Sequence, residues 1–469
     1  MTDIRTTSAS ELLVRVSPDD LAPMHAQLER ELRAAVRAGR LAPDMSLPST
    51  RLLAAELGVS RGVVVEAYEQ LVAEGYLVGR HGSGTRVASR AIIPVPEPRS
   101  TPPPQPPIRV DFRPGRPDVS QFPRASWLRS TKRVLNEAPA DRFGYADGRG
   151  LLELREALAR YLNRVRGTAA DPDRVVISNG YSQALTLICA VLHAAGARRL
   201  AMEEPSYEGA RAIARAAGLQ LVPVPVDEDG LLLSALERSG ADAVLVTPAH
   251  QYPTGGVLPS YCRAELAKWA VRNDAFIIED DYDAEYRYDR VPIGAIQGIA
   301  PNRVIYAGSA SKTLAPGLRL GWMLVPASLV ERVAEAKIAA DHGSAALEQL
   351  AFADFLQRGE LDRHLRRMRP IYRRRRDALV ATLAEHLPDL RITGTAAGLH
   401  LLAWLPNGMD EAAIVERAAE AGLVLYGLDP QRLRPGGPGG LIFGYANLTE
   451  HEISDGVRLL ASVIESMAS

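Results

Sequence analysis

Lysine is almost absent from this 469-residue sequence, which has four lysines and a large excess of arginine among its 55 basic residues. The sequence also lacks an excess of charge of either sign. Its formal net charge is −1, which gives no general attraction to nucleic acid or to a membrane surface. No apolar run approaches the roughly 18 residues of a membrane span, and the N-terminus lacks a secretory signal pattern. Any binding to DNA must therefore come from a local arrangement of side chains, and we expect a cytoplasmic protein that contacts no membrane.

Cysteine is scarce as well. Cys189 and Cys262 are the two cysteines, and neither belongs to a C-x-x-C pattern. This argues against a disulfide framework and against a metal site built on cysteine. We predict two buried free thiols in a reducing compartment and no bound metal.

One segment of the sequence is unusually rich in proline. Residues 91–107, AIIPVPEPRSTPPPQPP, hold eight prolines, which oppose helix and sheet and favour an extended polyproline II linker. The length of the chain indicates two or three domains. We therefore predict an N-terminal domain over 15–88, a linker over 89–110 and a larger domain over 111–469.

The smaller part has the element order of a winged helix-turn-helix. Apolar residues at helical spacing predict a helix over 22–38. Ser49 or Thr50, and then Ser60, are placed to cap two further short helices, RLLAAEL and RGVVVEAYEQLVAEG, with Gly58 between them. The strands YLVGR and TRVAS surround the turn HGSG, which predicts a wing.

Residues 22–88 resemble the GntR-type winged helix-turn-helix. The resemblance implies binding of double-stranded operator DNA, since arginines suit both phosphate contact and guanine recognition. The residues that it implies for the recognition helix and the wing are Arg51, Ser60, Arg61, Gly62, Val63, Arg80, His81 and Gly82. Contact with another protein is the alternative use of such a motif.

The larger part alternates short β-branched runs with longer amphipathic stretches. Strands that alternate with helices form a largely parallel sheet covered on both faces, so the large domain is predicted to be an α/β domain. Ligands of such sheets bind beyond the carboxyl ends of the strands. The predicted strands are 174–178, 199–203, 243–247, 276–280 and 303–307.

One of the four lysines follows such a strand. Lys312 lies in GSASKTLAPGLR after the fifth run, whereas Lys268 and Lys337 fall within helical patterns, where we predict solvated charges. A lysine amine forms a Schiff base with an aldehyde cofactor, which an arginine does not. This chemistry explains a lysine at position 312 in a sequence that otherwise prefers arginine.

Pyridoxal 5′-phosphate (PLP) is an aldehyde cofactor whose other requirements match residues at the neighbouring strand ends. Its pyridinium nitrogen needs a carboxylate, its phenolate oxygen a donor and its ring an aromatic face, for which we predict Asp280, Tyr282 and Tyr207. Its phosphate needs backbone N–H groups at a helix start, hydroxyls and an arginine. The residues predicted for the phosphate are Gly180, Tyr181, Ser182, Ser309, Ser311 and Arg319.

Together these residues resemble the fold type I aminotransferases over about 111–460. In that family the tyrosine of the segment FGYADGRGLLELREAL, here Tyr145, reaches the phosphate of the partner subunit's cofactor, which implies a homodimer. A GntR-type domain joined by a linker to such a domain is the architecture of the MocR family of bacterial regulators. EDDYDAEY, HQYPTGG, GSASKTLAPGLRLGW and RRMRPIYRRRRDAL are similar to motifs of that family. The implied fold class is α/β, with an N-terminal winged helix-turn-helix and a C-terminal fold type I PLP-dependent aminotransferase-like domain.

Departures from the aminotransferase pattern bear on the ligand. Their third strand is followed by Asn-Pro-x-Gly, where this sequence has Tyr252. Either Gln251 or His250 replaces the asparagine, or nothing does. Their substrate carboxylate is clamped by an arginine near the C-terminal strand, but GGLIFGYANL contains none, and Arg432 and Arg434 lie just upstream. The weak carboxylate clamp argues against efficient transamination.

An arginine that binds one particular effector is also missing from this sequence. In the GABA-responsive MocR regulator, a ligand arginine follows the stacking tyrosine by two residues, and here that place is Gly209. We therefore predict that the protein is not a GABA sensor.

The resulting prediction is a PLP-binding transcription regulator with little or no turnover. Either PLP itself is the signal, as in MocR members that resemble the pyridoxine-synthesis regulator PdxR, or a small amine forms an aldimine with it. The alternatives are an active PLP-dependent aminotransferase with an accessory DNA-binding domain, and a scaffold without cofactor. The arginine-rich run 363–379, which we predict to be a helix broken near Pro370, is either a solvated helix face or a second surface for DNA phosphates.

Overall fold

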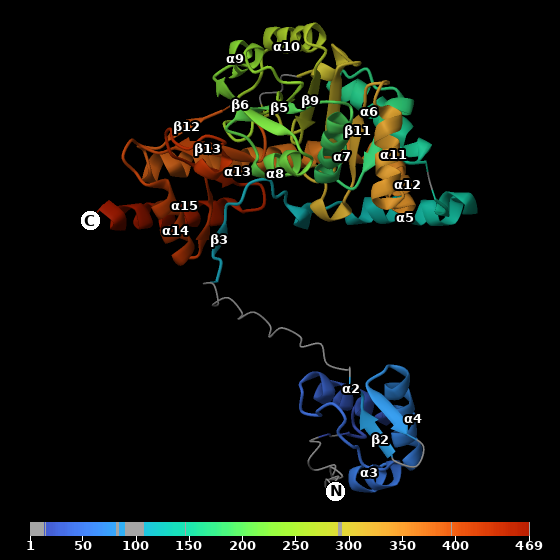
Figure 1. Cartoon of the computed structure of the whole chain (residues 1–469). Coiled ribbons are helices and arrows are strands. Elements are labelled where there is room, and N and C mark those ends of the chain that lie inside the picture. The colour runs from blue at the N-terminus through green and yellow to red at the C-terminus, as the bar shows by residue number, and fades with distance from the viewer. Residues whose placement is uncertain are drawn as a thin grey trace. The chain divides into compact units, whose positions relative to one another are not determined.

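The structure is a computed structural model that describes residue 14 and residues 16–80, 84–89, 107–145, 147–288, 293–394 and 396–468. It divides into two compact units, Met1–Pro104 and Gln105–Ser469 (Figure 1). Each unit has a hydrophobic core of its own. Most of the predicted linker lies outside the described residues. None of the described helices is both long and apolar enough to cross a bilayer.

The small unit contains the predicted helices and strands in the predicted order. They are α2 (Met24–Arg37), α3 (Thr50–Leu57), α4 (Arg61–Ala73), β1 (Leu77–Arg80) and β2 (Gly84–Val87). The helix α2 buries Leu28 and Leu32, four residues apart, against α4 because this spacing puts them on one face. The strands β1 and β2 pair in antiparallel register.

The turn between α3 and α4 follows from local sequence. The Ser49 hydroxyl accepts a hydrogen bond from the Leu52 N–H at 3.3 Å, so Ser49 rather than Thr50 caps α3. Gly58 ends that helix in the left-handed region, with φ 67°. Ser60 occupies the N-cap position of α4, but its side chain makes no capping hydrogen bond.

The large unit is built on an eight-stranded sheet in the order β4-β11-β10-β9-β8-β5-β6-β7. Neighbours from β10 to β6 are parallel, whereas β11 is antiparallel to both β10 and β4, and β7 is antiparallel to β6. The strands are β4 (Val175–Ser178), β5 (Arg199–Glu204), β6 (Gln220–Asp227), β7 (Gly230–Leu231), β8 (Ala243–Val246), β9 (Phe276–Asp281), β10 (Val304–Ser309) and β11 (Gly321–Leu324). The five predicted strands are confirmed to within two residues, and so is the largely parallel sheet.

Helices cover both faces of this sheet, as predicted (Figure 1). Alternate residues of a strand point to opposite faces. Val175 and Ile177 of β4 therefore pack in the core that includes α6 and α12, whereas Val176 packs in the core that includes α7, α8 and α11. The helices of this part are α5 (Arg124–Glu137), α6 (Leu152–Arg166), α7 (Tyr181–Ala194), α8 (Glu208–Ala216), α9 (Leu233–Glu237), α10 (Ser260–Arg272), α11 (Val330–Asp341) and α12 (Ala346–Gln357).

A smaller sheet and the C-terminal helices complete the large unit. Its order is β12-β13-β16-β15, all antiparallel, and a separate short pair joins β14 to β3 in parallel. The elements are β3 (Val110–Asp111), β12 (Arg391–Thr393), β13 (His400–Trp404), β14 (Leu423–Val424), β15 (Tyr426–Gly427), β16 (Gly440–Gly444), α13 (Glu360–His386), α14 (Glu411–Glu420) and α15 (Glu450–Ala468). The short 3₁₀ helices are η1 (Val119–Gln121), η2 (Ala140–Phe143), η3 (Pro172–Arg174), η4 (Ile296–Gly298), η5 (Pro316–Leu318) and η6 (Asp429–Gln431).

The prediction of a helix broken near Pro370 was wrong, because α13 continues through this proline. A proline inside a helix loses one backbone hydrogen bond and costs about 3 kcal/mol. Here apolar side chains on both sides of it, among them Leu365 and Leu379, are buried in the core of the large unit. Packing along the whole helix therefore outweighs the local cost.

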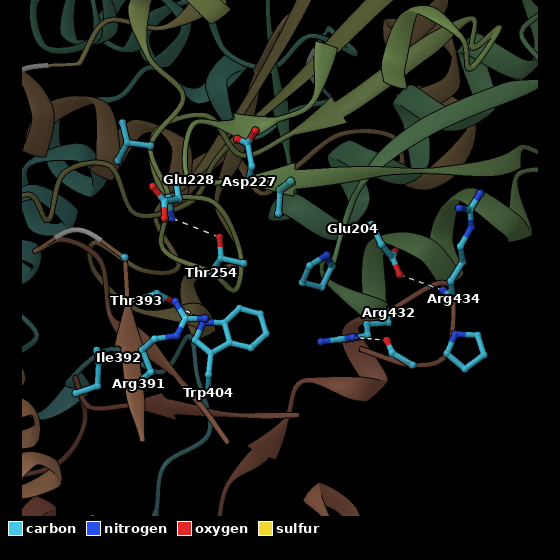
Figure 2. A pocket seen from close by; sticks show the side chains of 17 residues that line it. Glu204, Asp227, Glu228, Thr254, Arg391, Ile392, Thr393, Trp404, Arg432 and Arg434 are labelled. Carbon is cyan, nitrogen blue, oxygen red and sulfur yellow. Dashed lines mark hydrogen bonds between the residues drawn. The ribbon is translucent and has the colours of Figure 1, made fainter. Parts of the chain in front are cut away.

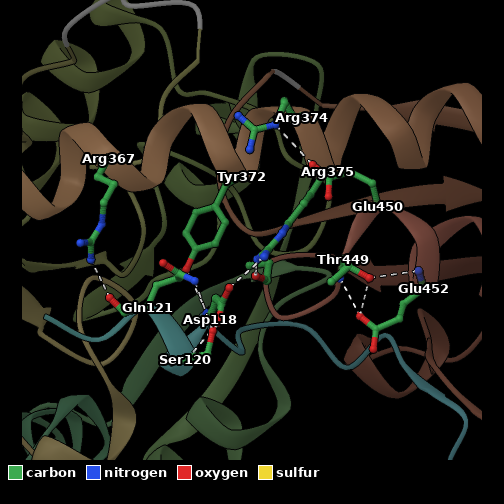
Figure 3. Close-up of polar contacts among 11 residues, drawn as sticks. Asp118, Ser120, Gln121, Arg367, Tyr372, Arg374, Arg375, Thr449, Glu450 and Glu452 are labelled. Carbon is green, nitrogen blue, oxygen red and sulfur yellow. Dashed lines mark hydrogen bonds and ion pairs between the residues drawn. The ribbon is translucent and has the colours of Figure 1, made fainter. Parts of the chain in front are cut away.

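Several arginines of the run 363–379 make contacts inside the large unit (Figure 3). The Arg367 guanidinium donates to the Gln121 carbonyl at 2.7 Å, and Arg374 forms an ion pair with Glu450 at 3.3 Å. Arg375 is buried and forms an ion pair with Asp118 at 2.8 Å. These contacts fasten α13 to the segment 118–121 and to the start of α15.

Candidate functional site

The sheet register brings three predicted strand ends together. Both Ser178 at the end of β4 and Ser309 at the end of β10 pair with Gly321, and Gly308 pairs with Asp281 at the end of β9. A Cβ atom at position 321 would lie 2.8 Å from the Ser178 hydroxyl and 2.9 Å from the Gly180 backbone, so only glycine fits there. Gly180, Asp280 and Lys312 therefore lie at the carboxyl ends of nearby strands, on the same side of the sheet.

Lys312 lies just beyond β10 in a half-buried position. Its Nζ donates a hydrogen bond of 2.5 Å to the Gly115 carbonyl. Burial lowers the pKa of Lys312, while the carboxylates of Asp283 and Asp280 oppose that shift. A lowered pKa provides more neutral amine at neutral pH, which is the form that attacks an aldehyde.

The prediction of a solvated charge at Lys337 was wrong. Its side chain is 0 % exposed and forms an ion pair of 2.6 Å with Asp341, one turn further along α11. The same carboxylate accepts hydrogen bonds from the side chains of Asn179 and Gln183 at 2.7 and 2.6 Å. Lys337 thus supports the segment that enters α7, whereas Lys268 is exposed as predicted.

Asp280 presents a buried carboxylate oxygen that lacks a partner. Its Oδ1 accepts no hydrogen bond within the described part of the chain. Burial raises the pKa of Asp280 to about 8, while the Tyr181 hydroxyl and Lys312 act in the opposite direction. A buried acceptor of this kind is costly unless a donor arrives, and a pyridinium N–H is such a donor.

The start of α7 forms an anion cradle together with Arg319. Gly180 is the N-cap of α7 with φ 87°, and the free N–H groups of Tyr181 and Ser182 follow it at the helix start. Arg319 donates to the Asn179 carbonyl at 2.6 Å, and a Cβ atom at position 180 would lie 2.8 Å from its guanidinium. Arg319 has φ 51°, a left-handed conformation that is uncommon for any residue except glycine.

The hydroxyl groups predicted for the phosphate follow the same strand end. Ser309 is buried as the last residue of β10, and Ser311 precedes Lys312 in a half-buried position. A helix N-terminus, an arginine and serine hydroxyls within one region are the donors that a phosphate group requires.

The three predicted tyrosines have different environments. The Tyr282 hydroxyl is buried and donates to the His250 carbonyl at 2.9 Å. Tyr207 is 49 % exposed, and its ring meets the ring of Tyr252 edge-on at 6.0 Å between centroids. Tyr145 is 94 % exposed, and its ring centroid lies 6.0 Å from that of His342.

Both candidates to replace the missing asparagine, Gln251 and His250, already form hydrogen bonds within the chain. The Gln251 amide donates to the carbonyls of Pro205 and Tyr252, and its oxygen accepts from Thr254. His250 contacts Tyr282 through both its carbonyl and its ring. The contacts of His250 with Tyr282 and of Gly115 with Lys312 were missed because they join residues 32 and 197 positions apart in the sequence.

These side chains fit PLP. When bound, PLP supplies an aldehyde that is electrophilic toward Lys312. Asp280 has a free acceptor for the pyridinium nitrogen, and the start of α7 with Arg319 can hold the phosphate. This conclusion rests on the Asp280 oxygen that lacks a partner within the described residues and on the N–H groups that follow Gly180 at the start of α7.

The two arginines considered for an effector carboxylate line a separate cavity of about 820 Å³ (Figure 2). Arg432 donates to the carbonyls of Gly436 and Pro438 in its own loop. The N–H of Arg434 donates to Glu204 at 3.0 Å, which fixes the backbone of this loop. The other residues around the cavity include Asp227, Glu228, Thr254, Arg391, Thr393 and Trp404, and none of the predicted cofactor residues is among them.

The candidate DNA-binding residues lie on the small unit. Arg51, Ser60, Arg61 and Gly62 are exposed around the start of α4, and Val63 is half-buried. Arg80 is the last residue of β1. His81 and Gly82 lie outside the described residues. Arg61 is the first residue of α4, the second helix of the motif, and this is the end that contacts bases in a helix-turn-helix.

Comparisons with known proteins agree with both units. Residues 111–454 match the family described as aminotransferase class I and II, and residues 25–87 match the bacterial regulatory proteins of the gntR family. The chain is 36% identical to the probable rhizopine catabolism regulatory protein MocR of Rhizobium meliloti, over 95% of each chain. It is 33% identical to the HTH-type pyridoxine biosynthesis transcriptional regulator PdxR of Corynebacterium glutamicum, over 96% of this chain and 99% of that protein.

A solved structure shows the same fold in the large unit. This is LysN, the α-aminoadipate aminotransferase of Thermus thermophilus, in complex with N-(5′-phosphopyridoxyl)-L-leucine. The TM-score is 0.70 at 27% identity, and the match covers 76% of this chain and 92% of LysN.

The fold and the site define a fold type I aminotransferase-like domain, with the site of a PLP-binding protein, on a chain that begins with a GntR-type helix-turn-helix domain. The chain belongs to the MocR family of HTH-type transcriptional regulators, which it matches over nearly its whole length.

Proposed function

We propose that this regulator binds PLP through Lys312 and responds to PLP itself, and that the response changes the affinity of its winged domain for operator DNA. The observation that carries this proposal has two parts. The cofactor site offers PLP hydrogen-bonding groups that have no other partner among the described residues, and the arginine that would clamp a substrate carboxylate is missing. The strand β16 contains no arginine, and the Arg432 guanidinium is held by carbonyls of its own loop. The likeness to PdxR, a regulator of pyridoxine biosynthesis, supports the same signal.

An effector with a carboxylate is less well supported. At position 209 a Cβ atom would lie 2.6 Å from the Tyr207 ring, so this conformation leaves no room for an arginine there. A small amine without a carboxylate is the second candidate effector, since it needs only the aldehyde of the cofactor. For the same reason we expect little or no transaminase turnover, and sustained conversion of an amino donor and a keto acid would instead indicate an enzyme with an accessory DNA-binding domain.

The proposed assembly is a homodimer in which Tyr145 reaches the cofactor of the partner subunit. Large apolar side chains are exposed in the segment 119–152, among them Leu128, Leu135 and Phe143 in addition to Tyr145. Exposed apolar side chains concentrated in one region favour a protein contact there. We place the DNA-binding domain at 15–88 and the effector domain at 111–469, with 89–110 as the linker.

The test is binding of the full chain to the intergenic DNA upstream of its own gene, at fixed salt, with and without PLP. A regulator that senses PLP will bind tightly in the presence of competitor DNA, and its affinity will shift with PLP. If the affinity for DNA is high and independent of PLP but changes when an amine is added, the amine would be the signal. Absence of specific binding would contradict a regulator.

Replacing Arg61 with alanine is expected to weaken operator binding by about 5- to 150-fold, because a bidentate arginine–guanine contact contributes about 1–3 kcal/mol. Arg61 is exposed at the first position of α4, and its Nε donates only a 3.3 Å hydrogen bond to Thr50. Arg40→Ala, which removes an exposed arginine outside α3 and α4, is the matched control. Equal losses in the two variants, measured by fluorescence anisotropy, would refute a role in recognition.

Removing Arg366 and Arg373 together is expected to leave the salt dependence of DNA binding unchanged. The run 363–379 makes many internal contacts, which favours an ordinary helix face over a second DNA surface. Arg366 and Arg373 are exposed, whereas Arg375 cannot be neutralised without breaking its buried ion pair. If the run did contact DNA, the slope of log affinity against log salt would fall by about two.

A further inference from the structure

His250 contacts two groups beside the cofactor site, the Asp283 carboxylate and the Tyr282 hydroxyl. Its Nδ1 lies 2.9 Å from Oδ2 of Asp283 and 3.0 Å from the Tyr282 hydroxyl. Its backbone carbonyl accepts a hydrogen bond of 2.9 Å from the same hydroxyl. The side chains of His250 and Asp283 are only 2 % and 1 % exposed. The tyrosine predicted to face the cofactor phenolate is therefore held by one buried residue from two sides.

The Asp283 carboxylate determines which ring nitrogen carries the proton. A carboxylate accepts hydrogen bonds, so Nδ1 of His250 must be protonated to satisfy it. The same N–H faces the Tyr282 oxygen, which directs the hydroxyl proton of Tyr282 away from the imidazole. The backbone of Gly398 packs closely against this pair, since an added Cβ atom there would lie 2.1 Å from the His250 ring and 2.5 Å from Oδ2 of Asp283, so only glycine fits at position 398.

Other ionisable groups surround this pair. The ring of His400 on β13 lies 5.0 Å from that of His250, and burial lowers its pKa so far that His400 stays neutral. On the side of the cofactor, Asp280 and Asp283 both act on Lys312. Tyr282 is the one of these groups that contacts His250 and is also predicted to meet the 3′-oxygen of PLP.

From these contacts we infer that His250 is a positioning residue for Tyr282. The Nδ1–H of His250 holds the Tyr282 oxygen, so that in the PLP-bound chain the hydroxyl proton turns from the His250 carbonyl to the 3′-oxygen of PLP. His250 thereby sets the proton affinity of the Schiff-base nitrogen at Lys312. The inference rests on the proposed binding of PLP at Lys312. A hydroxyl that donates to the 3′-oxygen stabilises negative charge there and weakens the hold of that oxygen on the neighbouring N–H. Loss of a well-placed hydroxyl will therefore raise the proton affinity of the nitrogen.

The test is a pH titration of the visible absorption of the PLP-loaded full chain. His250→Ala and Tyr282→Phe should each move the midpoint upward, by about one pH unit, which is tenfold in proton affinity. In the double variant, loss of His250 should add nothing to the effect of Tyr282→Phe, because it acts only through that hydroxyl. His250→Asn, which keeps an N–H donor near the position of Nδ1, should stay close to the parent midpoint.

Three outcomes would overturn the inference. They are an unchanged midpoint in His250→Ala, a His250 effect that persists without the Tyr282 hydroxyl, and one bound zinc per chain, which would make the ring nitrogen a metal ligand. Borohydride fixation of PLP to Lys312 in every variant shows that the binding site is intact. Failure of fixation in the parent protein would instead contradict the proposed function.

Discussion

Replacement of Lys312 by alanine will abolish covalent attachment of PLP and make DNA binding indifferent to the cofactor. Lys312 is the lysine that follows β10, it is half-buried, and partial burial lowers its pKa while the nearby Asp280 opposes that shift. Among the predicted cofactor residues, it alone has a side chain that can form a Schiff base. Loss of that bond should weaken PLP binding at least about 100-fold, which corresponds to about 3 kcal/mol.

Borohydride reduction followed by peptide mapping checks this result directly. The parent chain should carry the reduced cofactor on Lys312, and the alanine variant should carry none. Lys312→Arg keeps the positive charge but cannot form the bond, so it should behave like the alanine variant. Lys268→Ala, which removes an exposed lysine paired with Glu265, should retain both labelling and the response of DNA binding. A labelled peptide in the alanine variant would mean that another amine is used.

Local pattern predicted much of the fold and of the cofactor site. The five runs of β-branched residues became strands because short apolar runs between amphipathic helices bury well on both faces of a sheet. Lys312 and Asp280 could be placed at one edge because parallel strands end together. Ser49 and Gly58 likewise marked the ends of α3.

The errors and omissions have a common physical cause, which is contact between distant parts of the chain. Lys337 has the helical spacing of a solvated residue, yet the fold buries it against Asp341 and the segment that enters α7. Pro370 has the local signal of a helix break, yet packing on both sides keeps α13 continuous. The hydrogen bond from Lys312 to Gly115 spans 197 positions and leaves no mark in either segment.

The three aspartates of the motif EDDYDAEY have different contacts in the folded chain. Asp280 has a buried oxygen without a hydrogen-bond partner in the described part of the chain, and Asp283 contacts His250. Asp281, between them, forms an ion pair with Arg166 at 2.6 Å and accepts from the Tyr306 hydroxyl at 2.6 Å. Both side chains of the ion pair are almost fully buried. Adjacent carboxylates on a strand point to opposite faces, so Asp281 belongs to the core rather than to the site.

Asp281→Asn is therefore expected to destabilise the large unit by about 3–5 kcal/mol, because it leaves the Arg166 charge buried without its partner. Burial alone would lower the pKa of Arg166, but Asp281 and Tyr306 raise it, so the guanidinium stays charged. Urea unfolding of the cofactor-free full chain can be followed by tryptophan fluorescence, since Trp127, Trp269, Trp322 and Trp404 all lie in the large unit. The midpoint should fall in proportion to the lost free energy.

Asp280→Asn is the matched control and should not lower that midpoint. The pKa of Asp280 is raised to about 8 in the folded chain from an ordinary value of 3.8, so the folded state holds an extra proton between about pH 4 and pH 8. Stability of the parent protein consequently falls as pH rises through that window, and the asparagine variant escapes this loss. Cofactor-free Asp280→Asn should therefore be at least as stable as the parent at pH 7, yet bind PLP more weakly. Equal destabilisation by the two variants would contradict the division between a cofactor carboxylate and a structural one.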